Sequence, residues 1–130
     1  MLITVDAADR RPLYQQVADE IKALIARGAL AEGATLPPVR QLAADLGVNL
    51  NTIATAYREL QDEGLLLIKH GSGAVVTERH TRAAQRPNAE ELRKPLRAAL
   101  TPLILAGLKR AEILSIVTEE LRGLMKGAKS

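Results

Sequence analysis

Residues 36–73 read LPPVRQLAADLGVNLNTIATAYRELQDEGLLLIKHGSG, and this stretch decides the fold. Gly47 stands where a first helix should end, and Asn49 is a residue type that caps the start of a second. The first helix is indicated by apolar residues at helical spacing, namely Val39, Leu42, Ala43 and Leu46. The second has its own apolar stripe, made of Ile53, Tyr57 and Leu60. Two helices joined by so short a turn predict a helix-turn-helix.

A small β-hairpin is predicted after Gly64. Leu65 to Ile68 is a short apolar run, residues 69–73 are typical of a turn, and residues 74–77 are strand-like again. The glycines of the turn supply positive φ or room for close backbone approach. We therefore expect a mainly α protein with a small two-stranded β-wing, which is a winged helix-turn-helix.

The segment before this motif is expected to support it. Pro12 suits the first turn of a helix that ends near Gly28 and buries one face, made of Leu13, Val17, Ile21, Leu24 and Ile25. Residues 2–5 alternate weakly between apolar and polar side chains, which fits either a short strand or a contact with a partner subunit.

The exposed side of the second predicted helix is suited to DNA. Opposite its apolar stripe it carries side chains that can approach a groove, namely Asn51, Thr52, Thr55 and Arg58. Its first-turn N–H groups attract phosphate. Lys69 and His70 place hydrogen-bond donors beside the tip of the wing. A solvated helix face and an ordinary hairpin explain each piece taken singly, but their succession at these spacings favours DNA binding.

Five short segments together resemble the DNA-binding domain of GntR-type transcriptional regulators. They are LYQQV at 13–17, the loop at 28–38, VRQLA at 39–43, VNLNT at 48–52 and AYREL at 56–60. The resemblance covers Arg11 to Thr77 and implies a domain that binds double-stranded DNA. It also implies that DNA contacts come from Arg40, from Asn49 and Thr52 at the head of the recognition helix, and from His70 with Gly71 in the wing.

Each of these residues has an expected role. Arg40 should contact a phosphate or a base at the groove edge, and Arg58 a phosphate. Asn49 and Thr52 should contact phosphate and bases. Bases in the major groove should be read by Asn51 and Thr55, and the minor groove should be entered by His70 with Gly71, while Lys69 places a further donor beside the tip of the wing.

Leu50 departs from the family pattern. Many relatives carry Arg or Pro at that position, and an Arg there can reach a guanine edge. Leucine cannot donate a hydrogen bond, so base readout at this place is either apolar, toward a thymine methyl group, or absent.

The composition excludes several classes of function. The chain has no cysteine, so neither a disulfide framework nor a thiolate metal site is available, and a reducing cytoplasm fits. Only Tyr14 and Tyr57 are aromatic, which disfavours the stacking platforms of single-strand and RNA binders. The sequence has no signal-peptide pattern, and its apolar runs are too short to span a bilayer, so we expect a cytoplasmic protein without a membrane partner.

The formal net charge of +3 is unevenly distributed. Residues 1–80 hold eight Lys and Arg against ten Asp and Glu, whereas residues 81–130 hold ten against five. The half expected to bind DNA is therefore not basic, and binding has to rest on placed donors and helix N-termini. A basic cluster past the wing either reaches flanking phosphates or belongs to a solvated linker; it consists of Arg79, Arg82 and Arg86.

The rest of the chain predicts a linker and a helical tail. Residues 79–88 are polar and are interrupted by Pro87, which is typical of a linker. We therefore divide the chain into a DNA-binding domain at 1–78, this linker, and a dimerisation tail at 89–130.

The tail predicts two helices. The first either is capped by Asn88 with Glu91 or starts only at Pro95, because a proline inside a helix lacks an N–H and bends it. Gly107 can close that helix, and a second follows from about Lys109. So short a hairpin buries too little surface to be stable alone, so we expect it to pack on another copy. The residues expected at this dimer interface are Leu92, Leu96, Leu100, Leu103, Ile104, Ile113, Val117 and Leu121.

The short tail resembles that of the YtrA-like subfamily of GntR regulators, which implies dimerisation. The histidines, His70 and His80, lie outside the tail, so we expect neither a metal-sensing domain nor a cofactor. The sequence leaves a small-molecule effector open. No catalytic constellation is present, since the chain lacks Cys and a phosphate-binding loop and Ser72 has no evident base, so we do not expect an enzyme.

The leading hypothesis is a homodimeric, sequence-specific DNA-binding repressor that places two recognition helices in successive major grooves of an inverted repeat. The alternative is a protein-interaction module, in which the winged helix is a scaffold and the apolar tail docks on another protein. The acidic balance of the first eighty residues favours that alternative.

Overall fold

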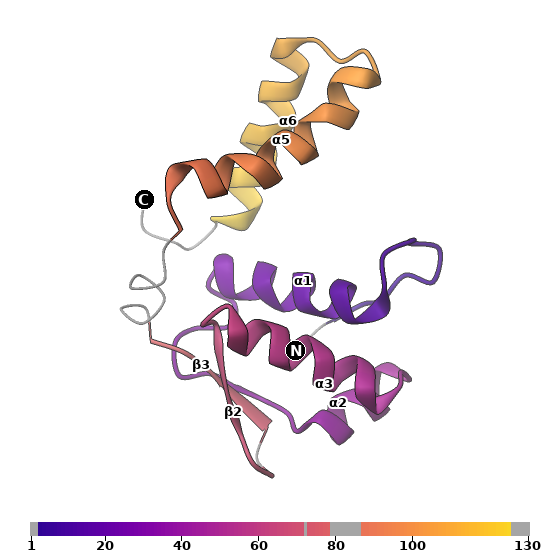
Figure 1. Ribbon diagram of the computed structural model, residues 1–130, viewed down its shortest axis with the longest axis vertical. Coiled ribbons are helices and arrows are strands. Elements are labelled where there is room, and N and C mark those ends of the chain that lie inside the picture. Colours follow the sequence, from indigo (N-terminus) through magenta and orange to yellow (C-terminus); the bar gives the residue numbers. More distant parts are fainter. Residues whose placement is uncertain (1–2, 72, 79–86, 126–130) are drawn as a thin grey trace. The chain divides into compact units, whose positions relative to one another are not determined.

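The computed structural model describes residues 3–71, 73–78 and 87–125, and the chain divides into two compact units, Met1–Gln85 and Arg86–Ser130 (Figure 1). The described elements of the first unit are α1 (Leu13–Ala26), β1 (Thr35–Leu36), α2 (Val39–Leu46), α3 (Leu50–Asp62), β2 (Leu66–Lys69) and β3 (Gly73–Val76). Those of the second are α5 (Ala89–Leu105) and α6 (Arg110–Leu124). The expected fold class, a mainly α protein with a β-wing and a two-helix tail, is confirmed. Most of the expected linker, with Arg79, Arg82 and Arg86, lies outside the described residues.

One hydrophobic core holds the first unit together. The apolar stripes predicted for α1 and α3 meet in it, and the sheet contributes the rest. Burial of each large apolar side chain stabilises the fold by about 1.5–3 kcal/mol. The largest fully buried side chains are Tyr57, Ile21, Leu36, Ile53, Leu60, Leu66, Val17 and Val76. At the edge of this core, Lys22 Nζ of α1 lies 2.9 Å from Glu63 Oε2, just after α3, so an ion pair also joins the two helices.

The start of α1 differs from the prediction. Pro12 occupies the N-cap position with a φ of −54° and a ψ of 147°, one residue before the helix begins. Leu13 is 38% exposed instead of lying on the buried face. Gln16 is buried, and its side chain accepts from the Asp6 N–H at 2.8 Å and donates to the Arg11 carbonyl at 3.1 Å. The buried amide thus fastens the segment before α1 at two points.

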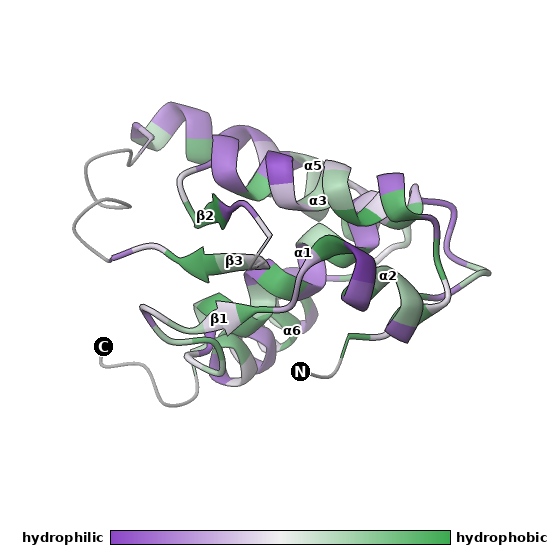
Figure 2. Cartoon of the chain, turned by 90° about the horizontal axis from the view of Figure 1, so that it is seen from below, coloured by the Kyte–Doolittle hydropathy of each residue, from purple (hydrophilic) through white to green (hydrophobic). Residues whose placement is uncertain are grey.

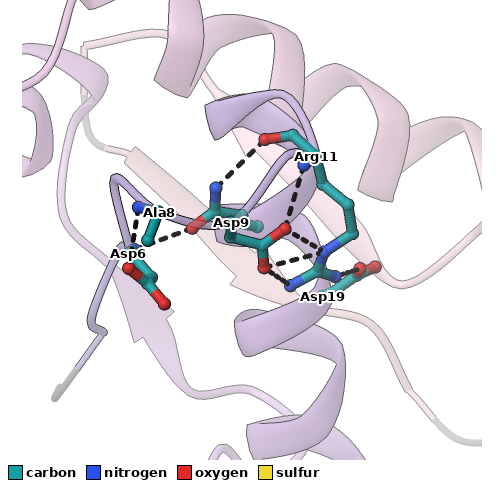
Figure 3. A network of polar contacts seen from close by, with 6 residues as sticks. Asp6, Ala8, Asp9, Arg11 and Asp19 are labelled. Carbon is teal, nitrogen blue, oxygen red and sulfur yellow. Dashed lines mark hydrogen bonds and ion pairs between the residues drawn. The ribbon is translucent and has the colours of Figure 1, made fainter.

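A polar network completes this attachment (Figure 3). The Arg11 guanidinium donates to both carboxylate oxygens of Asp9, with Nη2 2.7 Å from Oδ2, and it also pairs with Asp19 of α1. Residues 3–5 form no strand, and Ile3 is buried in the core of its own unit. Neither alternative stated for residues 2–5 predicted that position for Ile3.

The predicted two-stranded hairpin is confirmed as β2 and β3, and β1, which the sequence does not predict, extends it to a three-stranded antiparallel sheet with the order β1-β3-β2. β2 and β3 pair from Leu66 opposite Val76 to Lys69 opposite Gly73, so Lys69 and Gly73 end the strands and do not belong to the turn. β1 adds two residues beside β3, with Leu36 opposite Ala74. Figure 2 shows β3 as hydrophobic over much of its length, as expected for a central strand.

In the second unit, the first helix starts after Asn88 and not at Pro95. The Asn88 side chain accepts a hydrogen bond from the Glu91 N–H at 2.9 Å, and α5 runs from Ala89 through both prolines. Gly107, with a φ of 89°, ends this helix as predicted. Lys109 is the N-cap of α6, and its N–H donates to Glu112 Oε1 at 3.0 Å.

Candidate nucleic-acid interface

The turn between α2 and α3 has the geometry that the sequence predicts. Gly47 ends α2 in the left-handed region, with a φ of 67°, which glycine adopts without steric strain. The next residue, Val48, donates its N–H to the Ala43 carbonyl at 3.0 Å. Asn49 then caps α3, because its Oδ1 accepts the Asn51 N–H at 2.7 Å. Both ends of the turn are therefore fixed by hydrogen bonds.

α3 turns one face to the core and leaves a polar face outside. The core face is made of Ile53, Ala56, Tyr57 and Leu60. On the outer face Asn51 and Arg58 are exposed, whereas Thr52 and Thr55 are half-buried at its margins. The structure thus places all four predicted contact residues of this helix outside the core, with Asn51 and Arg58 the most accessible.

Arg40 lies at the start of α2 and is exposed. The loop that leads to it is held by Tyr57 of α3, whose hydroxyl donates to the Pro37 carbonyl at 2.7 Å. Burial raises the pKa of Tyr57, so the phenol stays neutral and keeps its proton for this bond. From the sequence, Tyr57 is expected only to contribute to the core. A buried tyrosine usually bonds its hydroxyl, which was the available signal, but its partner twenty residues away was not predictable.

The end of the wing lies against the same loop. A Cβ placed on Gly73 would come within 2.1 Å of the Leu36 carbonyl oxygen and 2.8 Å of the Pro37 carbonyl carbon. Because Gly73 pairs with Lys69, the wing reaches its turn beside the loop that leads into α2. His70 and Gly71 occupy that turn and are exposed. The Leu36–Pro37 loop is therefore the meeting point of α2, α3 and the wing.

Some of the acidic side chains of the first unit are neutralised by ion pairs within that unit. Asp9 and Asp19 pair with Arg11, and Glu63 pairs with Lys22. The hydrogen bond from Arg11 lowers the pKa of Asp9 below its ordinary value, so this carboxylate stays charged and paired near neutral pH. No such pair within the described residues involves the exposed cations of the candidate interface, which are Arg40, Arg58 and Lys69. These cations are therefore available to phosphate although the whole unit is not basic.

The expected dimerisation residues fall into two groups in the second unit. Half of them are half-buried within the hairpin of a single chain, namely Leu100, Leu103, Ile113 and Val117. The other half are exposed, namely Leu92, Leu96, Ile104 and Leu121. The single apolar stripe expected for α5 is thus divided between an inner and an outer face. Other large apolar side chains exposed in this unit are Leu105, Leu114, Ile116, Leu124 and Met125.

The described residues contain neither a membrane-spanning helix nor a cluster of metal ligands. None of their helices combines the length and the apolar character needed to cross a membrane. No group of three His, Cys, Asp or Glu side chains in this part of the chain is placed to hold a metal ion. His80 lies outside the described residues.

The chain is similar to known transcriptional regulators. Residues 13–76 match the model of the bacterial regulatory proteins of the gntR family. The HTH-type transcriptional repressor YtrA of Bacillus subtilis (strain 168) is 35% identical over 77 residues, which cover 59% of each chain. YtrA from Sulfolobus acidocaldarius, a GntR-family transcription factor of known structure, is 36% identical with a TM-score of 0.61, over 78% of this chain and 99% of that one.

A further solved structure contains DNA. The DNA-binding domain of AraR in complex with operator ORX1 is 28% identical with a TM-score of 0.52, over 59% of this chain and 96% of that one. The match to YtrA of B. subtilis spans only 59% of that protein's length. The family match, the winged helix-turn-helix and the nearly complete coverage of the Sulfolobus protein lead to one conclusion. The chain belongs to the GntR family of bacterial regulatory proteins and is similar to its YtrA-type members.

Proposed function

We propose that the chain is a sequence-specific DNA-binding transcriptional regulator, and specifically a cytoplasmic repressor that binds an inverted-repeat operator as a homodimer. The observation that carries the proposal is the capped helix α3 with its polar outer face, flanked by cations that no ion pair neutralises within the described residues. A helix of this kind enters the major groove in helix-turn-helix proteins. The similarity to AraR, whose DNA-binding domain was solved in complex with an operator, supports DNA binding by this domain.

The proposed contacts follow from the placement of each side chain. Asn51 reads bases from the outer face of α3, Thr55 reads bases from the margin of that face, and Thr52 also contacts DNA from the margin. Asn49 uses its Oδ1 for the cap and presents its amide N–H₂ to the DNA. Phosphates are contacted by Arg40 and Arg58, the minor groove is contacted by His70 with Gly71, and Lys69 donates to the DNA beside the tip of the wing.

The second unit supplies the proposed dimer contact. In one chain, α5 and α6 have no buried residue, and many of their leucines and isoleucines are exposed. Two short helices with so much exposed apolar surface are stabilised when a second copy covers it. We therefore assign residues 1–78 to DNA binding and residues 89–130 to pairing. The two-fold pairing places the recognition helices about 34 Å apart, one turn of DNA.

Selection from fragmented genomic DNA tests this function. The purified full chain is expected to enrich one motif, an inverted repeat whose half-sites are centred about one helical turn apart. Enrichment of nothing above the input DNA would contradict DNA reading and would favour the interaction-module alternative. A repressor is further expected to lower expression from a reporter promoter that contains the selected motif, and increased expression would contradict repression.

A further inference from the structure

Leu50 is a large apolar side chain in a polar setting. It is the first residue of α3 and is 38% exposed, next to the exposed Asn51. Among the described residues of the first unit, the other exposed large apolar side chains are Leu13 on α1 and Leu67 on β2. Only Leu50 therefore combines exposure and apolar character on the helix that we propose to read DNA.

The neighbours of Leu50 make its position more specific. Ala54 lies four residues further along α3, one helical turn away on the same side, and is half-buried. Asn51 and Thr55, again four residues apart, follow on the adjacent side of the outer face. The outer face thus has an apolar edge, made of Leu50 and Ala54, beside a polar edge made of Asn51 and Thr55. Side chains in a helix lean toward its N-terminus. Leu50 therefore extends the apolar edge to the N-terminal end of α3.

The major groove offers one apolar group to such an edge. Each base pair presents hydrogen-bond donors and acceptors there, and only thymine adds a C5-methyl group. A leucine placed against guanine or cytosine would remove water from polar edges without replacing the lost hydrogen bonds. Against thymine it buries a methyl group and leaves the polar positions to Asn51 and Thr55.

We propose that Leu50 is a specificity-determining residue that reads the methyl group of a thymine in each operator half-site. This proposal rests on the proposed function, because it assumes that α3 enters the major groove. The operator should therefore contain a thymine whose methyl group contributes to affinity at the position that faces Leu50.

Substitution of deoxyuridine for thymine tests the proposal without changing the protein. Deoxyuridine differs from thymidine only in lacking the C5-methyl group, and each thymine of a selected half-site is replaced in turn. At one position the full chain should lose about fourfold in affinity, the loss that corresponds to one buried methyl group. With Leu50→Ala the same DNA substitution should change the affinity by less than about twofold.

Leu13→Ala is the matched control. Leu13 is also the first residue of a helix, α1, and has the same exposed fraction, 38%. This variant should keep the whole deoxyuridine effect, and its thermal unfolding is compared with that of Leu50→Ala. If Leu50→Ala fails to fold, the conservative Leu50→Met replaces it and should retain the thymine preference.

The outcomes separate the two proposals. If a motif is selected but no deoxyuridine position weakens binding by more than about twofold, the Leu50 proposal is overturned and the proposed function stands. An equal loss for the native chain and for Leu50→Ala also overturns it, because another contact or the DNA shape then senses the methyl group. If no motif is selected, the proposed function fails and the Leu50 proposal fails with it.

Discussion

The hydroxyl of Tyr57 donates a hydrogen bond of 2.7 Å to the carbonyl of Pro37. Tyr57 lies in the third turn of α3, and Pro37 lies in the loop that precedes α2. Gly73 of the wing approaches the same loop closely. The bond therefore joins the proposed recognition helix to the segment that positions both Arg40 and the wing.

Replacement of Tyr57 by Phe removes this bond and leaves the Pro37 carbonyl without its partner. The free energy of unfolding should fall by about 1 kcal/mol, the usual net contribution of one hydrogen bond. Urea denaturation of the full chain, followed by circular dichroism, measures the change. A variant as stable as the native chain would show that water replaces the hydroxyl.

The same residue makes stability depend on pH in the alkaline range. Burial raises the pKa of Tyr57, so the folded state keeps the phenol neutral while the unfolded state ionises above its ordinary pKa of about 10. This contribution is complete below about pH 10 and is lost as the pH rises from there toward the folded pKa. Tyr57→Phe should therefore lose less stability between about pH 9 and pH 11 than the native chain. Parallel curves would contradict this assignment.

Gly73 should tolerate no side chain, whereas Gly71 should tolerate one at a small loss. A Cβ on Gly73 would meet the Leu36 carbonyl oxygen at 2.1 Å, and the residue has a φ of 83°. Gly71 has a φ of 75°, but nothing lies within 4 Å of its Cβ position. Gly73→Ala should lower the free energy of unfolding by about 3 kcal/mol, through overpacking and backbone strain, and Gly71→Ala by about 1 kcal/mol. Equal losses in thermal unfolding would contradict the close contact.

Two substitutions of Asn49 should distinguish its role in helix capping from its role in DNA binding. Asn49→Asp keeps an oxygen for the Asn51 N–H, so its stability should match or exceed that of the native chain. Its negative charge beside DNA phosphates should weaken operator binding by tenfold or more, the effect of about 1.4 kcal/mol. Asn49→Ala should instead lose about 1 kcal/mol of stability together with the cap. Native affinity in Asn49→Asp would remove this residue from the DNA interface.

Arg40 and Arg11 form a matched pair of exposed arginines. Arg11 is held by Asp9 and Asp19, whereas Arg40 has no ion pair within the described residues. Arg40→Ala should weaken binding to all DNA sequences and reduce the slope of log affinity against log salt by about one. Arg11→Ala should leave that slope unchanged. In gel shifts over a salt series, a native slope for Arg40→Ala would contradict its phosphate contact.

Local chemistry explains which parts of the fold were predictable from the sequence. Gly47 and Asn49 act on backbone groups within a few residues, so their types alone indicate the turn and the cap. β1 has only two residues and exists because it pairs with β3 about forty positions later, which no local pattern indicates. Leu13 has helical spacing but is exposed, whereas the polar Gln16 is buried and fastens the segment before α1 through its side chain.

The candidate site follows the same rule. Asn51 and Arg58 were predictable as exposed residues because they lie opposite a clear apolar stripe. The bond from Tyr57 to Pro37 and the approach of Gly73 depend on contacts between elements, and these were not predictable. In the tail, the division of one stripe into inner and outer faces depends on how α5 meets α6, so the sequence did not distinguish Leu100 from Leu96.

We propose that two copies, paired through their tails, hold two recognition helices in register on one operator. The most direct test measures mass and affinity on the selected duplex, with and without an insertion of about five base pairs, half a helical turn, between the half-sites. Leu121→Glu, a change of a tail residue that is 51% exposed, is measured alongside. We expect two chains per duplex. The insertion should reduce the affinity by about a hundredfold or more, and Leu121→Glu should reduce it by about tenfold or more. Each change prevents the two copies from binding both half-sites together. One chain per duplex with an affinity that does not depend on spacing would contradict the account.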